Sequence, residues 1–201
     1  NLNNQTHSPF EVIIVDSSSE NINNEYLNNR SKFKFNLIYK RLKNISYPGK
    51  SRNMGIKLAK GDYLAFIDSK TIPDIHWIEQ TLNLLKNEVK CIIGGVNVSA
   101  KNYFQKILRS TSYGIQNNET LVGTIIETNF FKKIGFFNEN SRAGEDIDWL
   151  NRLRFYKKNY GRKNISNINY TGLPSNFYDT IKKYIIYSYH TSKNITVLAG
   201  P

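Results

Sequence analysis

Cysteine is nearly absent from this chain of 201 residues, in which Cys91 stands alone. A single cysteine excludes an internal disulfide and a cysteine-rich zinc site, and a reducing setting is the default. Long apolar runs are missing too, since no stretch approaches the roughly 20 consecutive apolar residues of a membrane-spanning helix. Residues 1–5 have neither the basic head nor the apolar run of a secretory signal. We therefore expect a cytoplasmic protein.

Acidic residues are scarce, with 16 Asp and Glu against 28 Lys and Arg, and the formal net charge is +12. Such a field attracts polyanions, which include nucleic acid, anionic lipid and phosphorylated small molecules. The basic residues are spread along the whole chain, and no zinc-finger or RNP-type motif accompanies them. Charge therefore supports three classes of partner and separates none of them.

Glycine-rich phosphate loops of either standard pattern are absent, which argues against a Rossmann dehydrogenase or a P-loop kinase. The chain contains instead short apolar strands that alternate with helical patterns. This alternation indicates an α/β domain with a mainly parallel sheet. Expected strands cover residues 11–16, 35–39, 63–68 and 90–96, and expected helices cover residues 52–60, 76–87 and 146–156.

Two of the expected strands end in an aspartate, Asp16 and Asp68. Ligands of open α/β sheets bind outside the carboxyl ends of the strands, so these two side chains are expected to face one crevice. The alternative is that each acid merely caps the segment that follows it.

Four segments in order resemble one family. Residues 3–16 look like its first helix, turn and second strand. Residues 48–63, which include the run Arg-Asn-Met-Gly, resemble its "ARN-x-G…A-x-G-D/E-Y" stretch. Residues 66–77 match its "D-x-D…P…W" stretch, and residues 133–152 match its "GGF-x-E…ED-x-D…R" block. Along nearly its whole length, the chain is similar to the family 2 glycosyltransferases.

The resemblance implies a GT-A, nucleotide-diphospho-sugar transferase fold: a three-layer α/β/α arrangement over residues 1–175, with a mainly parallel central sheet. The family's first strand has no counterpart, so we expect an N-terminally truncated domain. Residues 176–201 are expected to form a helix and tail. The aromatic and lysine-flanked helix of this segment either packs on the domain or lies on a membrane surface.

The implied activity is transfer of a sugar, with inversion, from a UDP- or GDP-sugar to a hydroxyl of a glycan, polysaccharide or lipid-linked acceptor. Bacterial-type polysaccharide biosynthesis is the expected setting. One alternative is a non-catalytic or degenerate transferase-like binding module that has lost its metal acid and first strand. Nucleic-acid binding rests on net charge alone and is not expected.

The resemblance assigns the general base to Asp146, with Glu145 beside it. Three neighbouring acids, Glu145, Asp146 and Asp148, would raise one another's pKa, which suits a base that works near neutral pH. The alternative is that they are first-turn acids of a helix. Asp16, Arg52 and Asp68 are expected to bind the nucleotide, although Arg52 could simply begin an amphipathic helix.

Lys70 stands where the family has its metal-binding aspartate. The usual cofactor, Mn²⁺ or Mg²⁺, is therefore in doubt, with Asp68 left as a weak candidate ligand. Three interpretations stay open: Lys70 replaces the metal charge on the diphosphate, the enzyme is degenerate, or Lys70 points into solvent.

A further group is expected near the donor sugar or acceptor, because glycine allows close backbone approach and tryptophan stacks on sugars. Strand-end turns and core packing explain the same residues equally well. The group consists of Gly94, Gly95, Gly123, Asp148 and Trp149.

Overall fold

The structure is a computed structural model that describes residues 1–18, 30–85, 88–113, 119–162 and 168–198. Its strands fall into a parallel pair, β1 and β2, and a larger sheet with the order β3-β6-β5-β8-β4, in which β7 also pairs with β5. The strands are β1 Glu11–Asp16, β2 Asn36–Arg41, β3 Tyr63–Ala65, β4 Thr71–Pro73, β5 Cys91–Val98, β6 Glu119–Glu127, β7 Tyr160–Arg162 and β8 Ile168–Tyr170.

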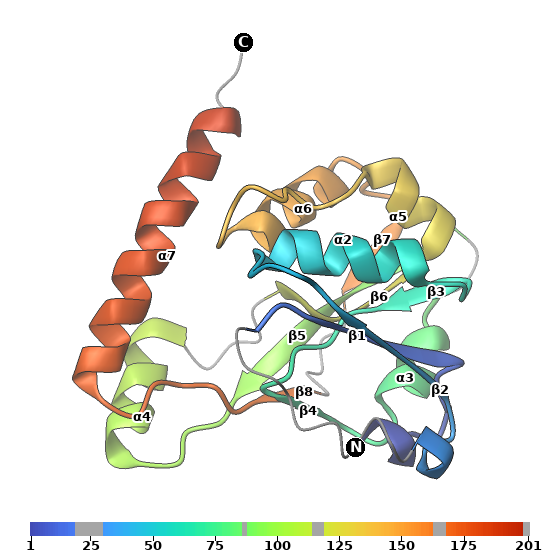
Figure 1. Ribbon diagram of the computed structural model, residues 1–201, viewed down its shortest axis with the longest axis horizontal. Helices are drawn as coiled ribbons and strands as arrows, with labels where there is room; N and C mark the ends of the chain where they lie inside the picture. Colours follow the sequence, from blue (N-terminus) through green and yellow to red (C-terminus); the bar gives the residue numbers. More distant parts are fainter. Residues whose placement is uncertain (19–29, 86–87, 114–118, 163–167, 199–201) are drawn as a thin grey trace.

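Helices cover both faces of the sheets, as Figure 1 shows: α2, α5 and α6 lie on one side and α3 on the other. Short 3-10 turns occur at Leu2–Asn4 and Arg30–Lys32, and a π-helical turn at Arg109–Tyr113. The α helices are α2 Pro48–Leu58, α3 Trp77–Leu82, α4 Tyr103–Leu108, α5 Thr128–Ile134, α6 Glu145–Arg154 and α7 Phe177–Leu198. The expected helix at residues 76–87 ends earlier, and its residues 86–87 lie outside the described part of the chain.

The expected α/β class and three-layer arrangement are confirmed, but the strand pairing is more mixed than a mainly parallel sheet. β5 pairs in parallel with β7 and β8, whereas β6 runs antiparallel to both of its neighbours, β3 and β5. The strand signal of residues 119–127 was missed because its apolar residues do not alternate regularly. That strand inserts between β3 and β5 and reverses the local direction of the sheet.

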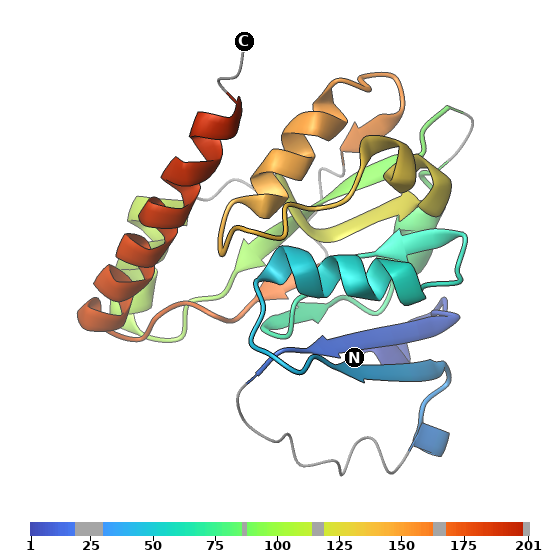
Figure 2. The same ribbon diagram turned by 45° about the horizontal axis from the view of Figure 1, so that its top comes forward.

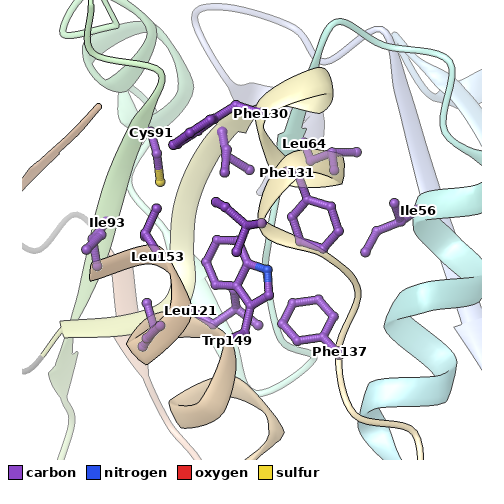
Figure 3. Packing of buried hydrophobic residues seen from close by; sticks show 13 residues of the cluster. Ile56, Leu64, Cys91, Ile93, Leu121, Phe130, Phe131, Phe137, Trp149 and Leu153 are labelled. Carbon is purple, nitrogen blue, oxygen red and sulfur yellow. The ribbon is translucent and has the colours of Figure 1, made fainter. Parts of the chain in front are cut away.

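The main core lies between the larger sheet and the helices α2, α5 and α6. Trp149 of α6 has no exposed surface and stacks on Phe131 of α5, with ring centroids 5.2 Å apart (Figure 3). Its indole Nε1 donates to the Gly135 carbonyl at 3.1 Å, so the polar atom of this buried ring is satisfied. A second core on the opposite face joins Trp77 and Ile78 of α3 to Ile125 and Ile168. These two cores fix the layers against each other.

Helix α7 extends away from the layered part of the molecule (Figure 2). Thr180 is buried near its start, and the His190 ring meets the Tyr47 ring edge-on at 5.8 Å between centroids. Much of its surface is nevertheless exposed, with Tyr178 at 74% and Ile185 at 65% of full exposure. Within the described residues, no helix has the length and apolar character needed to cross a bilayer. Residues 199–201 of the expected tail lie outside the described part of the chain.

Candidate functional site

A cleft of about 810 Å³ is lined by residues of β1, α2 and β3. Much of it is apolar, because residues of β1 and β3 form its walls and Trp77 and Leu121 contribute to its lining. No strand of the described residues pairs with β1 or β3 on the side opposite their known partners, β2 and β6. Arg52 and Asp68 supply opposite charges to the lining. The partners of these two residues define the candidate site.

Arg52 of α2 connects the three segments that the sequence motifs single out. Its guanidinium forms a short ion pair with Glu145 at the start of α6 and a second one, at 3.6 Å, with Asp68 after β3. The guanidinium also lies over the Phe137 ring, 5.7 Å from the centroid. A planar guanidinium presents several donors at fixed angles, which suits simultaneous contact with two carboxylates. Arg52, Asp68 and Glu145, predicted separately from the sequence, thus meet in one cluster.

Asn53, the next residue along α2, holds the loop that leads into α6. It is only 2% exposed and makes a paired contact with the Phe137 backbone: its Nδ2 donates to the carbonyl at 2.9 Å and its Oδ1 accepts from the amide at 3.0 Å. Its Nδ2 also donates to Glu139 at 2.9 Å. Asn53 was quoted in the sequence motif but given no role there. The structure makes it the residue that fixes the loop carrying Phe137 beneath Arg52.

Glu145 is 4% exposed, and its carboxylate faces Arg52. Burial raises the pKa of Glu145 above its ordinary value; the Arg52 charge opposes this shift and the neighbouring Asp146 charge adds to it. Removing the Arg52 charge would leave a buried carboxylate without its counter-ion, a strongly unfavourable arrangement. Glu145 and Arg52 therefore act as one unit that positions α6 against α2.

Asp146 occupies the first turn of α6, and its side chain is partly exposed. Its Oδ1 accepts a hydrogen bond from the amide of Ile147 at 2.9 Å. Within the described residues, its other carboxylate oxygen has no hydrogen-bond partner. Asp146 thus places a partly exposed acceptor next to Glu145 in the first turn of α6, although it does not belong to the lining of the cleft.

Asp16 ends β1 and is 7% exposed. Its two carboxylate oxygens accept hydrogen bonds from the Ser18 amide at 2.8 Å and from the Tyr39 hydroxyl at 2.7 Å. Burial alone would raise the pKa of Asp16, but these hydrogen bonds outweigh it and the pKa lies below its ordinary value. Its neighbour Val15 lines the cleft together with Asp68. No direct contact joins Asp16 to Asp68 among the interactions of the described residues.

Lys70 does not join the Arg52 cluster. Its side chain is exposed and lines a second pocket, which contains residues of β8 and α7. Its backbone carbonyl accepts a hydrogen bond from the Thr171 amide at 2.9 Å, which ties the loop after β3 to the end of β8. Among the described residues, no contact of the Lys70 side chain supports the interpretation that it replaces a metal charge in the Arg52 cluster.

The residues that were expected near the donor sugar or acceptor take part in the packing of the fold instead. A Cβ on Gly94 would lie 2.3 Å from the Val122 carbonyl oxygen, and Gly123 has a φ of +85°, so both glycines allow β5 and β6 to approach closely. Gly95 is buried in the same strand. Asp148 pairs with Arg152 at 3.0 Å, and Trp149 belongs to the core. In this structure, none of these residues presents a side chain to the cleft.

Few residues at this position could hold a divalent cation, with Asp68 as the candidate ligand. Asp68 already faces Arg52, and Lys70, two residues later, carries a positive charge. Within the described ranges, no group of three or more His, Cys, Asp or Glu side chains is arranged to hold a metal ion. A cation such as Mg²⁺ is usually held by one or two carboxylates together with substrate phosphates, so a metal at Asp68 would have to be held jointly with the donor diphosphate.

Comparison with known proteins decides the family, because the sequence profile described as "Glycosyl transferase family 2" matches residues 1–160. The chain belongs to this family. Among curated relatives, it is 30% identical over 181 residues to the Staphylococcus aureus poly(ribitol-phosphate) beta-N-acetylglucosaminyltransferase TarP, which covers 80% of this chain and 53% of TarP. It is 32% identical over 154 residues to an uncharacterized glycosyltransferase of Rickettsia bellii, covering 71% of this chain and 22% of that protein. The family 2 chain thus spans about half or less of the length of these relatives.

Solved structures confirm the GT-A fold for this family 2 chain. The crystal structure of S. aureus TarS 1-349 in complex with UDP-GlcNAc gives a TM-score of 0.64 at 18% sequence identity, covering 87% of this chain and 54% of TarS 1-349. The complex of the same protein with UDP gives a TM-score of 0.63 at 20% identity, with coverage of 90% and 57%. At this level of identity the likeness establishes the fold.

Proposed function

We propose that the protein transfers a sugar from a nucleoside-diphosphate sugar to a hydroxyl group, with inversion at the anomeric carbon. The observation that carries the proposal is the cluster in which Arg52 joins Asp68 to Glu145, directly beside the accessible carboxylate of Asp146. Cationic donors for a diphosphate and a carboxylate base are the two groups that this reaction requires.

The comparisons support the choice of donor and of acceptor class. TarS, which shares the fold, has been crystallised with UDP and with UDP-GlcNAc. TarP is a poly(ribitol-phosphate) beta-N-acetylglucosaminyltransferase, and the Bacillus spizizenii relative, 38% identical over 71 residues, is a poly(ribitol-phosphate) beta-glucosyltransferase. We therefore favour a UDP-sugar as the donor over a GDP-sugar and a polymeric glycan or polyol phosphate as the acceptor.

In the proposed reaction, Asp146 accepts the proton of the acceptor hydroxyl as its oxygen attacks the anomeric carbon. The new bond forms between that oxygen and the anomeric carbon, while the bond from this carbon to the diphosphate oxygen breaks and its electron pair leaves with the nucleoside diphosphate. Attack on the face opposite the leaving group inverts the configuration. General-base help of this kind accelerates a reaction by roughly 100- to 10,000-fold.

Arg52 is the cation placed to stabilise the leaving diphosphate. Its contacts with Asp68 and Glu145 hold the guanidinium in position before substrate arrives, which reduces the reorganisation needed in the transition state. Glu145 is in this proposal a positioning residue, because its carboxylate is buried and directed at Arg52. Asp16, fixed by Ser18 and Tyr39, is proposed to accept hydrogen bonds from the nucleoside.

Asp68 and Lys70 favour a second candidate, a donor-binding module without transfer activity. Asp68 is already paired with Arg52, and Lys70 lines a separate pocket, so the usual metal-binding acids are not assembled. Such a module would bind nucleotide but release no product. Turnover therefore separates the two candidates, and binding alone does not.

Calorimetric titration of UDP, GDP and ADP, each with Mn²⁺ and with a chelator, tests the donor site. We expect UDP to bind in both conditions, because Arg52 supplies a cation without metal. The Arg52→Leu variant should weaken UDP binding by about 10-fold or more, as expected for loss of a charged hydrogen bond. The matched control is Arg154→Leu, because Arg154 pairs with Glu119 outside the cluster. Binding of none of the three nucleotides by the wild-type protein would overturn the proposal.

Helix α7 is proposed to lie on an anionic membrane surface. Its exposed side chains combine aromatic and aliphatic groups with lysine, the composition of helices that lie in a bilayer interface. Residues 177–198 contain three lysines and one acid, Asp179, and the chain as a whole carries a net charge of +12. The large exposed apolar side chains are Phe177, Tyr178, Ile181, Tyr184, Ile185, Tyr187 and Tyr189.

A further inference from the structure

The start of α2 is contacted by two segments that are distant in the sequence. A Cβ on Gly49 would lie 2.0 Å from the Asn138 carbonyl oxygen, so the loop before α6 lies directly against the first turn of α2. From α7, the His190 ring meets the Tyr47 ring edge-on, with the two centroids 5.8 Å apart. The position of this turn therefore depends on α7 as well as on the loop before α6.

Tyr47 is the N-cap residue of α2. Its backbone carbonyl accepts a hydrogen bond from the Ser51 amide at 3.2 Å, whereas its side chain makes no capping hydrogen bond. The Ser51 hydroxyl also shares a hydrogen bond with the Ser46 hydroxyl at 3.0 Å. Arg52 follows Ser51 directly in the chain. A displacement of Tyr47 would thus be transmitted to Arg52 through this hydrogen-bonded turn.

The part of α7 that contacts Tyr47 is far from the beginning of this helix. At the rise of roughly 1.5 Å per residue in a helix, His190 lies about 20 Å from the start of α7 at Phe177. His190 is partly buried, whereas Ile185, about one turn earlier, is exposed. Edge-on packing is a preferred geometry of ring pairs and restrains their mutual orientation. The ring pair is therefore a specific contact that fixes this part of α7 against the start of α2.

We propose that Tyr47 and His190 are positioning residues for Arg52, so that α7, through this ring pair, fixes the first turn of α2 at the donor site. Pro48, Ser51 and Arg52 all line the cleft, so this turn forms part of its wall. A guanidinium that is held in place before the substrate arrives stabilises charge on a diphosphate without costly reorganisation. The inference rests on the proposed function, in which Arg52 contacts the donor diphosphate, and it gives α7 a role in that site.

The test compares Tyr47→Ala and His190→Ala with Tyr103→Ala, the matched control. Alanine at position 47 keeps the backbone carbonyl that accepts the hydrogen bond from Ser51, so this variant removes only the ring. Tyr103 of α4 is 79% exposed and does not line the cleft, so its loss removes a ring of the same size elsewhere. Tyr47→Phe and His190→Phe complete the set, because each keeps a ring at its position.

Two quantities are measured for each variant. Amide hydrogen exchange of peptides from residues 46–56 reports whether the first turns of α2 are held, and calorimetric titration reports the affinity for UDP. We expect both alanine variants to exchange faster in this segment and to bind UDP about 2- to 10-fold more weakly, a range set by the energy of one ring contact. The double alanine variant should bind UDP no more weakly than either single variant, because both substitutions remove the same contact. The control and the two phenylalanine variants should behave like the wild type.

The outcomes separate a positioning role from a purely structural one. Faster exchange with unchanged UDP affinity would overturn the inference, because the contact would then serve the fold alone. Unchanged exchange in His190→Ala would overturn it as well, since α7 would then not hold the turn. Either result leaves UDP binding by the wild type intact, and the proposed function with it. Failure of the wild type to bind UDP would instead overturn the proposed function and, with it, this inference.

Discussion

At the scale of single residues, the candidate site depends on charged groups held by neighbours rather than on isolated side chains. Arg52 contacts two carboxylates, and Asn53 next to it fixes the loop that carries Phe137. Asp16 is held in the same way by Ser18 and Tyr39. Each functional group is thus fixed before a ligand binds, which lowers the entropy lost on binding.

The lowered pKa of Asp16 predicts a pH dependence of stability. Because the folded-state pKa lies below the ordinary value of 3.8, the stabilisation is present above that pH and is lost as the pH falls through the folded pKa. Removing the Tyr39 hydroxyl takes away one hydrogen bond to the carboxylate. We expect Tyr39→Phe to be less stable than wild type at pH 7, and the difference to shrink at pH 3.

Urea unfolding of the wild type and Tyr39→Phe at pH 7, 5, 4 and 3 measures this difference. Tyr63→Phe is the control, since the Tyr63 hydroxyl has no hydrogen-bond partner among the described residues. A stability difference for Tyr39→Phe that is the same at every pH would show that the hydrogen bond does not favour the ionised carboxylate.

At the scale of elements, the first turn of α2 must lie directly against the loop before α6. A Cβ on Gly49 would lie 2.0 Å from the Asn138 carbonyl oxygen, a backbone atom that cannot rotate away. Gly55, on the same helix, has room, because its Cβ would meet Val15 at 3.5 Å. Two glycines on one helix therefore have opposite tolerance for a methyl group.

We expect Gly49→Ala to lower the free energy of unfolding by about 1–3 kcal/mol, because the extra methyl overpacks the contact. Gly55→Ala should raise it by about 0.5–1 kcal/mol, since alanine favours a helix interior over glycine. Denaturant unfolding of both variants measures the two effects. Equal effects of the two substitutions would contradict the close approach of α2 to residue 138.

The local part of this architecture could be predicted from the sequence. Strands such as residues 11–16 and the helix around Arg52 follow from short-range apolar patterns, and the family motifs point to Asp68, Glu145 and Asp146. Contacts between distant segments could not be predicted in this way. Asn53 meets Phe137 across 84 positions and Thr171 meets Lys70 across 101, and no local pattern encodes either pairing. The same reason explains why the antiparallel pairing of β6 with β3 and β5 was not predicted.

At the scale of the whole molecule, α7 adds an exposed apolar surface to a strongly basic protein. If this surface binds anionic lipid, sedimentation with vesicles of phosphatidylglycerol should carry the protein into the pellet, and vesicles of phosphatidylcholine should not. Salt should weaken the binding, because it screens the electrostatic part. Ile185→Glu should reduce the bound fraction, because it places an acid on the apolar surface, whereas Lys158→Glu, away from α7, should reduce it less. Equal binding to both vesicle types would contradict the proposal.

The whole assembly of cleft, Arg52 cluster and Asp146 leads to one central claim, that the chain catalyses sugar transfer with Asp146 as the base. The most direct measurement is the rate of UDP release from UDP-GlcNAc in the presence of a ribitol-phosphate oligomer, for the wild type and for Asp146→Asn. We expect a rate at least about 100-fold lower in Asp146→Asn, the lower limit for general-base help, with unchanged UDP affinity. Equal rates in the two proteins, or no release by a wild-type protein that binds UDP, would contradict it.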